Sequence, residues 1–334
     1  MNLASADVRA IPSTHLVSVI IPAHNAEATI NETLNSVRLQ THPNLEIIVV
    51  DDGSSDRTNS IAMAHSYADH RVRVISQNNS GVAAARNRGW QAATASLIAF
   101  LDADDVWAES KIQRQLELIL KSGDKVGLVY TWYSEIDEQS RILRRPQQKT
   151  ARGNVVDHLL LGNLIGNGSS ALVRRKVLED IGGFDSTLRD AGAHGCEDYL
   201  FYFRVAARSE FDLIPEYLTG YRVLGQRMSS DRQRMLRSWL LVAAEMNRCY
   251  PERSTLVDLG VEYYVRSLLI DAFALSDIAQ VRPLISLWVA HRSKGTPFTT
   301  LSMLVRTFLR GLMYKTQLNF DKLHRRRRRH FATS

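Results

Sequence analysis

The chain of 334 residues has the length of two average domains, or of one large α/β domain with an appendage. Its composition, with 45% hydrophobic and 23% charged residues, excludes a disordered, collagen-like or low-complexity protein. Only two cysteines are present, which excludes a disulfide framework and a four-cysteine zinc site and favours a reducing compartment. There is no apolar run of the length of a spanning helix, and the first dozen residues lack the apolar stretch of a signal peptide. We therefore expect a cytoplasmic protein.

The positive charge of the chain is concentrated near its C-terminus. The net charge is +7, yet segment 291–334 alone carries eleven Lys and Arg against one acidic residue, for a net charge of +10. Five consecutive arginines begin at Arg325 and end at Arg329, while residues 1–290 together carry a net charge of −3. This pattern predicts that only the tail contacts an anionic surface, either membrane lipid or nucleic acid.

Short β-branched runs alternate with helical patterns in the first 125 residues. We expect buried strands at 17–22, 45–50, 72–75 and 96–101, and helices at 27–40, 58–70, 82–93 and 111–121. This alternation is typical of βαβ units and a parallel sheet. Polar clusters follow three of the strands, at 22–25, 51–52 and 102–105. Because ligands of parallel sheets bind beyond the carboxyl ends of the strands, we expect these clusters to meet in one crevice.

The remainder of the chain has a less regular pattern. We expect a strand at 126–133, a turn near 137–140 and a loop that enters a strand at 167–173. A turn at 181–185 comes before a helix that begins at 197–198. From about residue 230 onward the pattern is helical and gives no strand signal.

Two carboxylates one residue apart, Asp102 and Asp104, follow the fourth expected strand. They cannot both face a sheet core without a large desolvation cost, so we expect them at the open edge of the sheet. Oxygen ligands of this kind suit Mg²⁺ or Mn²⁺, which commonly bridge diphosphate oxygens. Taken alone, the motif is more typical of an acidic turn that caps the next helix, because turns rich in aspartate are common.

Two further acidic positions are ambiguous in the same way. Asp52 follows a buried strand, where a carboxylate accepts hydrogen bonds from a ribose hydroxyl or a base N–H, or else caps a turn. Glu197 and Asp198 begin a helix, whose N-terminus stabilises an anion, so they supply either a general base or ordinary helix charge. Neighbouring Cys196 lacks the partner pattern of a nucleophile and is expected to be a small packing residue.

Six motifs occur in an order that resembles glycosyltransferase family 2. They are VSVIIPAHN at 17–25, IIVVDDGSSD at 47–56, NSGVAAARNRG at 79–89, FLDADD at 100–105, GGFD at 182–185 and ED at 197–198. The resemblance covers about residues 15–225, and the first four motifs form a highly specific set. It implies an α/β fold of the GT-A type, a Rossmann-like, mostly parallel sheet with flanking helices, followed here by an α-helical C-terminal extension. The family consists of inverting, metal-dependent enzymes that use nucleotide-sugars.

The resemblance implies a role for individual residues of this chain. Asp52 matches the carboxylate that contacts the nucleotide base, and Asp102 is directed towards the ribose while Asp104 binds the metal. Asp198 matches the general base, with Glu197 beside it. The other positions implied in nucleotide-sugar binding are Pro22, Ala23, Asn25, Glu27, Arg86 and Ala103. The loop at 182–185 resembles an acceptor-side loop.

General chemistry fits these implied roles. The departing nucleoside diphosphate gains negative charge, which a bound Mn²⁺ or Mg²⁺ stabilises. The acceptor hydroxyl needs a positioned base, and one direct displacement inverts the anomeric carbon without a covalent nucleophile. The implied partners are a nucleotide-sugar donor, with UDP-sugars favoured, and a glycan or lipid-linked acceptor of a surface polysaccharide.

The region after residue 229 lies outside the resemblance. Segments 284–289 and 301–314 are amphipathic, and the second contains Arg306 and Arg310. Basic amphipathic helices followed by an arginine run suit the surface of an anionic leaflet, which would place the protein on the cytoplasmic face of a membrane. The alternative is a helical subdomain that packs on the catalytic core, followed by a disordered tail.

We predict an N-terminal extension at 1–14, a GT-A domain at 15–228, a helical region at 229–320 and a basic tail at 321–334. Within the GT-A domain, the nucleotide-sugar half spans about 15–125 and the acceptor half about 126–228. A nucleic-acid-binding protein is the principal alternative; it accounts for the tail but leaves the aspartates unexplained. Two further hypotheses fit the sequence less well. An inactive, binding-only member of the family would not need the acidic pairs, which are intact here. A nucleotidyltransferase would leave Asp198 without a role.

Overall fold

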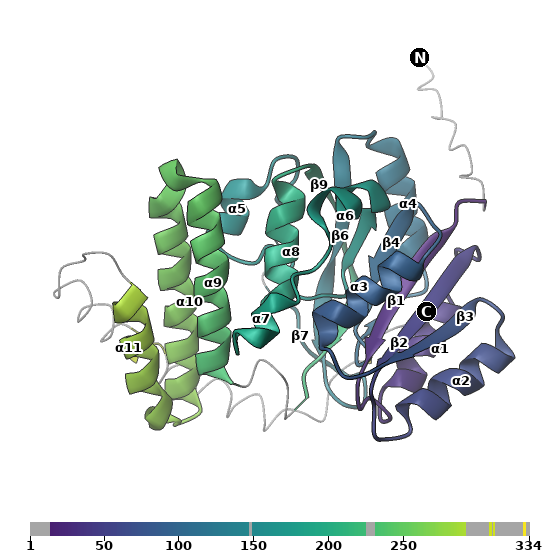
Figure 1. Cartoon of the computed structure of the whole chain (residues 1–334), viewed down its shortest axis with the longest axis horizontal. Helices are drawn as coiled ribbons and strands as arrows, with labels where there is room; N and C mark the ends of the chain where they lie inside the picture. The colour runs from purple at the N-terminus through teal and green to yellow at the C-terminus, as the bar shows by residue number, and fades with distance from the viewer. Residues whose placement is uncertain are drawn as a thin grey trace, which may run out of the picture.

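The computed structural model describes residues 14–146, 149–224 and 231–291, together with residues 307, 308, 310, 330 and 331. A twisted sheet has helices on both faces, and the helices of the C-terminal region form a further layer at one side (Figure 1). The predicted α/β architecture with a helical extension is therefore confirmed.

One sheet runs through the whole α/β part of the molecule. Its strands are ordered β3 (Val72–Gln77), β2 (Leu45–Asp52), β1 (Val17–Ala23), β4 (Leu97–Phe100), β8 (Ala171–Arg174), β6 (Val126–Ile136), β9 (Glu210–Arg222) and β5 (Val106–Trp107). The short strand β7 (Ile142–Arg144) pairs with β6. Strands β1 to β4 are parallel, as predicted for the first 125 residues. Strand β8 is antiparallel to both of its neighbours.

Alternating side chains of the central strands enter two hydrophobic cores, one on each face of the sheet. Val19 and Ile21 face α1 (Ile30–Arg38), α2 (Thr58–Ala68) and α4 (Lys111–Lys121). Ile20 faces the other core, to which α3 (Val82–Ala92), α5 (Val156–Leu161), α6 (Arg175–Ile181), α7 (Thr187–Asp190) and α8 (Glu197–Ala206) contribute. Since successive side chains of a strand point to opposite faces, a continuous apolar run is what a sheet covered on both sides requires.

Two of the differences between the predicted elements and the structure have a recognisable cause. The helix predicted at 27–40 begins only at Ile30, because the residues after the β1 loop form turns before the helix starts. Strand β9 was not predicted at all. Pro215 lies within it, and its pairing with β6 shifts register between Thr131 and Tyr133, so the sequence lacks the regular alternation of a strand.

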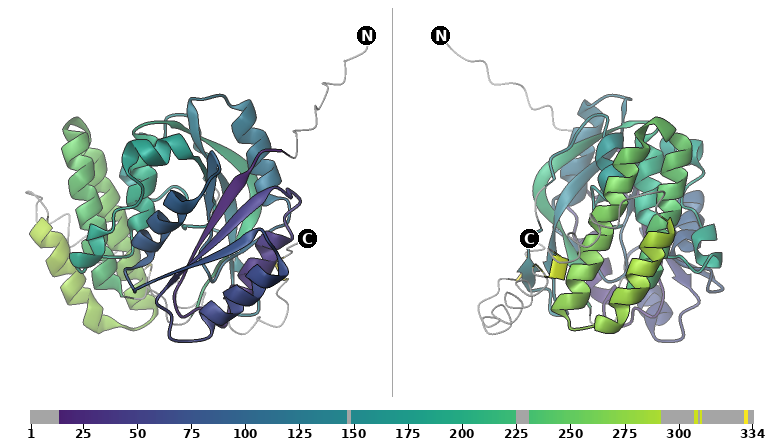
Figure 2. Two further views of the ribbon diagram at one scale, coloured as in Figure 1. Left: turned by 45° about the vertical axis from the view of Figure 1, so that its right-hand side comes forward. Right: turned by 90° about the vertical axis from the view of Figure 1, so that its left-hand side faces the viewer.

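The C-terminal region is helical, as expected, over its described part. It contains α9 (Arg232–Cys249), α10 (Ser254–Ala274) and α11 (Val281–His291), with short 3₁₀ turns at Pro251–Arg253 and Ile278–Gln280. Figure 2 shows these helices standing side by side against the α/β part. Trp239, Leu269 and Trp288 are buried in the same core as residues of α5 and α8. The helical region up to residue 291 thus packs on the α/β core, and packing of this kind is one of the two predicted alternatives.

Most of the basic tail lies outside the described residues. Arg306 and the run from Arg325 to Arg329 belong to that part, and so does most of the N-terminal extension. Phe331, in contrast, is only 6% exposed, and its backbone N–H donates to the carbonyl of Ser140 (2.8 Å). No helix among the described residues is long and apolar enough to cross a membrane. The proposed domain boundaries remain predictions.

Candidate active site

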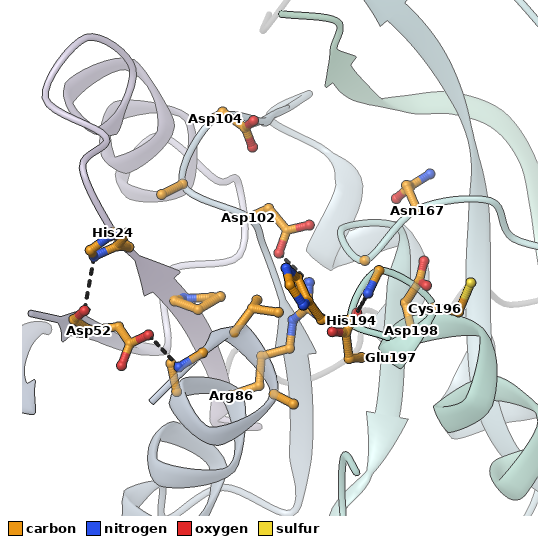
Figure 3. A pocket seen from close by; sticks show the side chains of 18 of the residues that line it. His24, Asp52, Arg86, Asp102, Asp104, Asn167, His194, Cys196, Glu197 and Asp198 are labelled. Atoms are coloured by element: carbon orange, nitrogen blue, oxygen red, sulfur yellow. Dashed lines mark hydrogen bonds and ion pairs between the residues drawn. The ribbon is translucent and has the colours of Figure 1, made fainter. Parts of the chain in front are cut away.

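A cleft of about 750 Å³ opens at the carboxyl ends of β1, β2 and β4. All of the predicted site residues except Glu27 line it: Pro22, Ala23, Asn25, Asp52, Arg86, Asp102, Ala103, Asp104, Glu197 and Asp198. Asp52 and Asp198 lie on opposite sides of this cleft, with Arg86 and Asp102 between them (Figure 3). The predicted convergence of the polar clusters in one crevice is therefore present, whereas the role of each residue remains a prediction.

Glu27 does not reach the cleft. Its carboxylate accepts hydrogen bonds from the backbone N–H of Arg57 (3.1 Å) and from the guanidinium of the same residue (3.2 Å). Its own backbone N–H donates to Asp56 (3.0 Å). Glu27 therefore ties the β1–α1 loop to the start of α2, and its sequence-based assignment to nucleotide-sugar binding is not supported by its position.

The loop that follows β1 is braced against the turn that follows β2. Asn25 adopts a left-handed backbone conformation (φ 49°), and its side-chain oxygen accepts a hydrogen bond from the backbone N–H of Ser55 (2.9 Å). A ring nitrogen of His24 lies 2.9 Å from the carbonyl oxygen of Asp52. Asparagine tolerates this conformation better than most residues, because its side chain bonds locally. The brace fixes one wall of the cleft.

Asp52 holds the loop at the start of α3. Its buried carboxylate accepts hydrogen bonds from the backbone N–H groups of Ser80 (2.7 Å) and Gly81 (2.8 Å) and from the side-chain amide of Gln77 (2.8 Å). A carboxylate offers about four lone-pair sites, so these three bonds leave capacity for a ligand donor. The neighbouring Asp51 caps the turn after β2, because its carboxylate accepts a hydrogen bond from the backbone N–H of Ser54 (3.2 Å).

Arg86 and Asp102 form an ion pair in the floor of the cleft. A guanidinium nitrogen lies 2.5 Å from a carboxylate oxygen of Asp102, and the side chains are 5% and 25% exposed, respectively. The ring of Phe184 packs 5.1 Å from the same guanidinium, so the loop at 182–185 supports Arg86. Burial lowers the pKa of Arg86, but the charge of Asp102, its hydrogen bond and the charges of Asp198 and Glu197 raise it overall. This arginine stays charged and neutralises part of an acidic site.

The loop after β4 is fixed by contacts that turn Asp104 into the cleft. Thr29 and Thr33 donate their hydroxyls to the carbonyl of Ala103, each at 2.9 Å. The buried carboxylate of Asp105 accepts hydrogen bonds from Ser169 (2.5 Å) and from the backbone N–H of Arg222 (2.8 Å). Asp105 is therefore structural, and these distant partners left no recognisable pattern in the sequence.

Asp104 is the carboxylate of this loop that is best suited to a cation. Burial, and after it the negative charge of Asp102, raise the pKa of Asp104 to about 6, although Arg222 and Arg86 lower it in part. None of the described side chains donates a hydrogen bond to its carboxylate. Asp104 is partly buried and lies close to the carboxylate of Asp102, and carboxylate oxygens are the ligands that Mg²⁺ and Mn²⁺ prefer. The donor set therefore fits a divalent ion.

The protein by itself does not enclose a metal site. The described residues contain no group of three or more His, Cys, Asp or Glu side chains that could hold an ion. A cation at Asp104 would need further oxygen ligands from a bound diphosphate or from water, as is usual for Mg²⁺ with phosphate substrates. Asp104 and Asp102 alone would therefore not complete the coordination of such an ion.

Asp198 lies at the N-terminus of α8, across the cleft from Asp52. One carboxylate oxygen accepts the backbone N–H of Tyr199 (2.7 Å), and Asn163 Nδ2 lies 3.4 Å from the other. Burial raises the pKa of Asp198 to about 6, with Arg86 acting against this shift and Glu197 adding to it. Glu197 accepts a hydrogen bond from the backbone N–H of Gly195 (2.8 Å) and so shapes the loop before the helix. Asp198 is ionised at neutral pH and is able to accept a proton.

Cys196 is a packing residue, as predicted. It is buried, its sulfur lies 3.9 Å from the carbonyl of Met235, and burial raises the pKa of its thiol. The cleft also contains residues that sequence analysis missed, among them Trp239 of α9 and Tyr264 of α10. They come from helices without a family motif, so only the fold reveals that they adjoin Asp198.

Comparison with known proteins places this site in a family. Residues 18–182 match the model described as Glycosyl transferase family 2. An uncharacterized glycosyltransferase from Nostoc sp. is 32% identical over 218 residues, which are 63% of this chain and 65% of that protein. The putative teichuronic acid biosynthesis glycosyltransferase TuaG of Bacillus subtilis is 43% identical over 120 residues, which are 36% of this chain and 47% of that protein. The chain spans less than two thirds of the length of these curated relatives.

Solved structures share the fold at low sequence identity. S. aureus TarS 1–349 in complex with UDP superposes with a TM-score of 0.58 at 16% identity, covering 90% of this chain and 91% of that chain. The mannosyltransferase PcManGT from Pyrobaculum calidifontis, in complex with GDP-Man and Mn²⁺, gives 0.58 at 18% identity, covering 91% and 88%. This likeness confirms the predicted GT-A fold. Residues 18–182 of the chain therefore form a domain of glycosyltransferase family 2.

Proposed function

We propose that the chain transfers a sugar from a nucleoside diphosphate donor to a hydroxyl group of a glycan or lipid-linked acceptor, with inversion at the anomeric carbon. The observation that carries this proposal is the convergence of Asp102, Asp104 and Asp198 on one cleft, where burial raises the pKa of Asp198 to about 6. The name of the Bacillus relative supports a role in surface polysaccharide synthesis.

The donor occupies the half of the cleft between Asp52 and Asp104. Asp52 and the braced loop at 22–25 line the nucleotide end, and Asp102, held by Arg86, faces the ribose. Asp104 would hold Mn²⁺ or Mg²⁺, which stabilises the charge that develops on the departing diphosphate. Neighbouring folds in complex with UDP-GlcNAc, UDP, and GDP-Man with Mn²⁺ support a nucleotide-sugar and a divalent ion, and UDP is the nucleotide we favour.

Asp198 acts on the acceptor side of the same cleft. Its carboxylate takes the proton of the acceptor hydroxyl while the hydroxyl oxygen bonds to the anomeric carbon and the bond to the diphosphate oxygen breaks. A base whose pKa lies just below neutral pH is ionised and still accepts a proton effectively. Asn163 orients this carboxylate from the α5–β8 loop. One displacement with one base inverts the configuration.

Release of nucleoside diphosphate from a donor panel tests the proposal. UDP-glucose, UDP-N-acetylglucosamine, GDP-mannose and dTDP-rhamnose are each incubated with the protein in Mn²⁺ and in EDTA. We expect release from donors of a single nucleotide class, in Mn²⁺ only, because transfer to water needs the donor site but no specific acceptor. No release from any donor contradicts a transferase, and equal release in EDTA contradicts metal dependence.

The nucleic-acid-binding alternative has less support from the site. It assigns no task to the cleft carboxylates, although burial raises the pKa of both Asp104 and Asp198. Perturbed carboxylates that converge in one cleft are typical of a functional site. Nucleic acid is therefore not an expected partner.

We also propose that the basic C-terminal segment binds an anionic membrane on its cytoplasmic face. The net charge of +10 over residues 291–334 supports this proposal, because a basic segment is attracted to anionic lipid. Membrane binding would also hold the enzyme close to a lipid-linked acceptor. Flotation with phosphatidylglycerol vesicles compares the full chain with a chain that ends before His291. We expect the full chain alone to float at low salt, and equal flotation of the two contradicts this partner.

A further inference from the structure

The cleft continues past Asp198 to a wall that the family domain does not build. Met235 and Trp239 of α9 and Tyr264 of α10 line the same cleft as Asp198. The family match ends at residue 182, so these three residues, which lie on the C-terminal helices, are outside it. Helices α9 and α10 bury much of their length against the catalytic core, which fixes the wall in place.

Three aromatic rings form a continuous stack in this wall. The rings of Trp239 and Tyr264 are stacked with their centroids 3.9 Å apart and an interplanar angle of 10°. Tyr199 of α8 also packs against Trp239, with the ring centroids 4.4 Å apart and the two rings tilted by 37°. Tyr264 is thus the end of the stack furthest from the buried core of α8. An ordered aromatic wall with a free end suits the apolar C–H face of a ring-shaped ligand.

Polar groups of the wall are available to a ligand. Within the described chain, no residue is hydrogen-bonded to the Tyr264 hydroxyl or to the Trp239 indole. Tyr264 and Asp198 line the same cleft, and burial, with Cys196 and the charge of Asp198 adding to it, raises the pKa of Tyr264, so its hydroxyl stays protonated. The Nδ1 atom of His194, which also lines the cleft, is buried without a hydrogen-bond partner among the described residues.

The charges at this end of the cleft favour a neutral ligand. Glu197 and Asp198 would repel a phosphodiester. Burial, and then Arg234, lower the pKa of His194, so that its ring is neutral at pH 7 and offers one donor and one acceptor. Arg189 also lines this end, and its guanidinium donates to Asn79 (2.7 Å), which positions the group but keeps its charge; the two carboxylates of Glu197 and Asp198 outnumber it. The hydroxyl groups of a neutral ligand both donate and accept hydrogen bonds, so they match the polar groups at this end of the cleft better than an anion does.

We propose that Trp239, Tyr264 and His194 form the acceptor subsite and that the acceptor is a glycan whose pyranose ring packs on the aromatic wall. This inference rests on the proposed transferase function and adds the class of acceptor to it. The Tyr264 hydroxyl and the His194 ring bind hydroxyl groups of this sugar, and the hydroxyl that reacts points to Asp198. The helical region therefore determines acceptor specificity.

Saturation-transfer difference NMR tests the subsite directly. The probes are the methyl glycosides of glucose, galactose, N-acetylglucosamine and mannose, with glycerol 3-phosphate as the anionic comparison, in UDP and Mg²⁺. The variants are Trp239→Leu, which removes the stack, and Tyr264→Phe, which removes only a hydroxyl and preserves the fold. Tyr263→Phe is the matched control, because Tyr263 is 49% exposed on the same helix and lines a separate cavity.

We expect saturation of the ring C–H protons of at least one glycoside. Its Kd should rise about fivefold in Tyr264→Phe, the effect of one lost hydrogen bond of about 1 kcal/mol, and tenfold or more in Trp239→Leu, with no change in Tyr263→Phe. The inference is overturned if no glycoside binds, if only glycerol 3-phosphate binds, or if both cleft variants bind like the wild type. Donor release is measured in parallel: its absence in the wild type defeats the transferase proposal, whereas release with unchanged glycoside binding defeats the subsite alone.

Discussion

Asp198 illustrates how the surroundings of one residue set its chemistry. Burial raises its pKa to about 6, while the nearby charge of Arg86 keeps that value from rising further. At pH 7 the carboxylate is therefore ionised, and below pH 6 it becomes protonated and can no longer accept a proton. The same burial makes the group a stronger base than an exposed aspartate.

Asp198→Asn should lower turnover by at least about 10²-fold, because an amide cannot accept the acceptor proton. In the wild type, kcat should fall as the pH drops through about 6 and should be level above it. The residual activity of the variant should lack this acidic limb. Asp180→Asn, at an exposed carboxylate of α6, is the control and should retain full activity. A variant within a few-fold of wild type at pH 7 contradicts the assignment of the base.

Arg86→Met should destabilise the protein by up to about 3 kcal/mol, measured by urea unfolding at pH 7, because it leaves Asp102 without its partner. The quarter of Asp102 that is exposed to water limits the effect. Arg88→Met, two residues further along α3 and exposed, should change the free energy of unfolding by less than about 0.5 kcal/mol. Equal effects of the two substitutions would show that the ion pair contributes nothing.

The residues of the site were predictable to different degrees. Asp52, Asp102, Asp104 and Asp198 stand in local motifs after strands or at a helix start, so the sequence identifies them. Glu27 was assigned by proximity to such a motif, yet it binds Arg57 instead. The contacts of Thr29, Ser169 and Arg222 that orient the acidic loop join segments 64 to 117 residues apart, and no local pattern encodes them.

At the scale of elements, close packing of α3 on β1 holds the arginine-bearing helix on the sheet. A Cβ atom added at Gly89 would lie 2.2 Å from Cγ2 of Ile20, far inside van der Waals contact. Glycine is therefore required in this helix despite its low helix propensity. Arg86 lies one turn earlier on the same helix, so this contact also positions the floor of the cleft.

Gly89→Ala should destabilise the protein by about 1–3 kcal/mol, the usual cost of overpacking, although alanine favours a helix by up to about 1 kcal/mol. Arg88→Ala on the exposed face of the same helix carries no such clash and serves as the control. Thermal unfolding measures both. A melting temperature of Gly89→Ala at or above that of the wild type would contradict the close packing.

Element types were easier to predict than their limits. The helix at Lys111–Lys121 agrees with the prediction at both ends, whereas α1 starts later than predicted because turns follow the β1 loop. Strand β9 escaped prediction because Pro215 and a shifted register interrupt its alternation. The start of α1 and the path of β9 are therefore determined by contacts with other parts of the chain rather than by the conformational preference of the local sequence.

At the scale of the whole molecule, the helical region is joined to the catalytic core through α10 and α5. A Cβ atom at Gly260 would lie 2.3 Å from the carbonyl oxygen of Leu160 and 3.1 Å from the backbone of Leu161. Backbone atoms cannot move aside as a side-chain end does, so this contact needs glycine. The helical pattern from about residue 230 onward predicted helices in the C-terminal region, but it does not encode the partner against which they pack.

Gly260→Ala should displace α10 and, with it, the aromatic wall. We expect a loss of stability of about 1–3 kcal/mol and weaker glycoside binding, whereas nucleotide binding at the distant Asp52 should persist. Asp258 is exposed on the same helix, so Asp258→Ala should leave stability, glycoside binding and nucleotide binding unchanged. Unaltered stability and glycoside binding in Gly260→Ala would contradict a fixed docking of the helical region.

A thermal-shift panel with UDP, GDP, dTDP and CDP, each in Mn²⁺ and in EDTA, tests the central claim of a metal-dependent nucleotide site most directly. A nucleotide at 100 times its Kd adds about 2.7 kcal/mol of stability, which such a measurement detects readily. We predict that one nucleotide raises the melting temperature in Mn²⁺ but not in EDTA, and that this increase is lost in Asp104→Ala. No shift with any nucleotide, or the same shift in EDTA and in Asp104→Ala, would contradict the account.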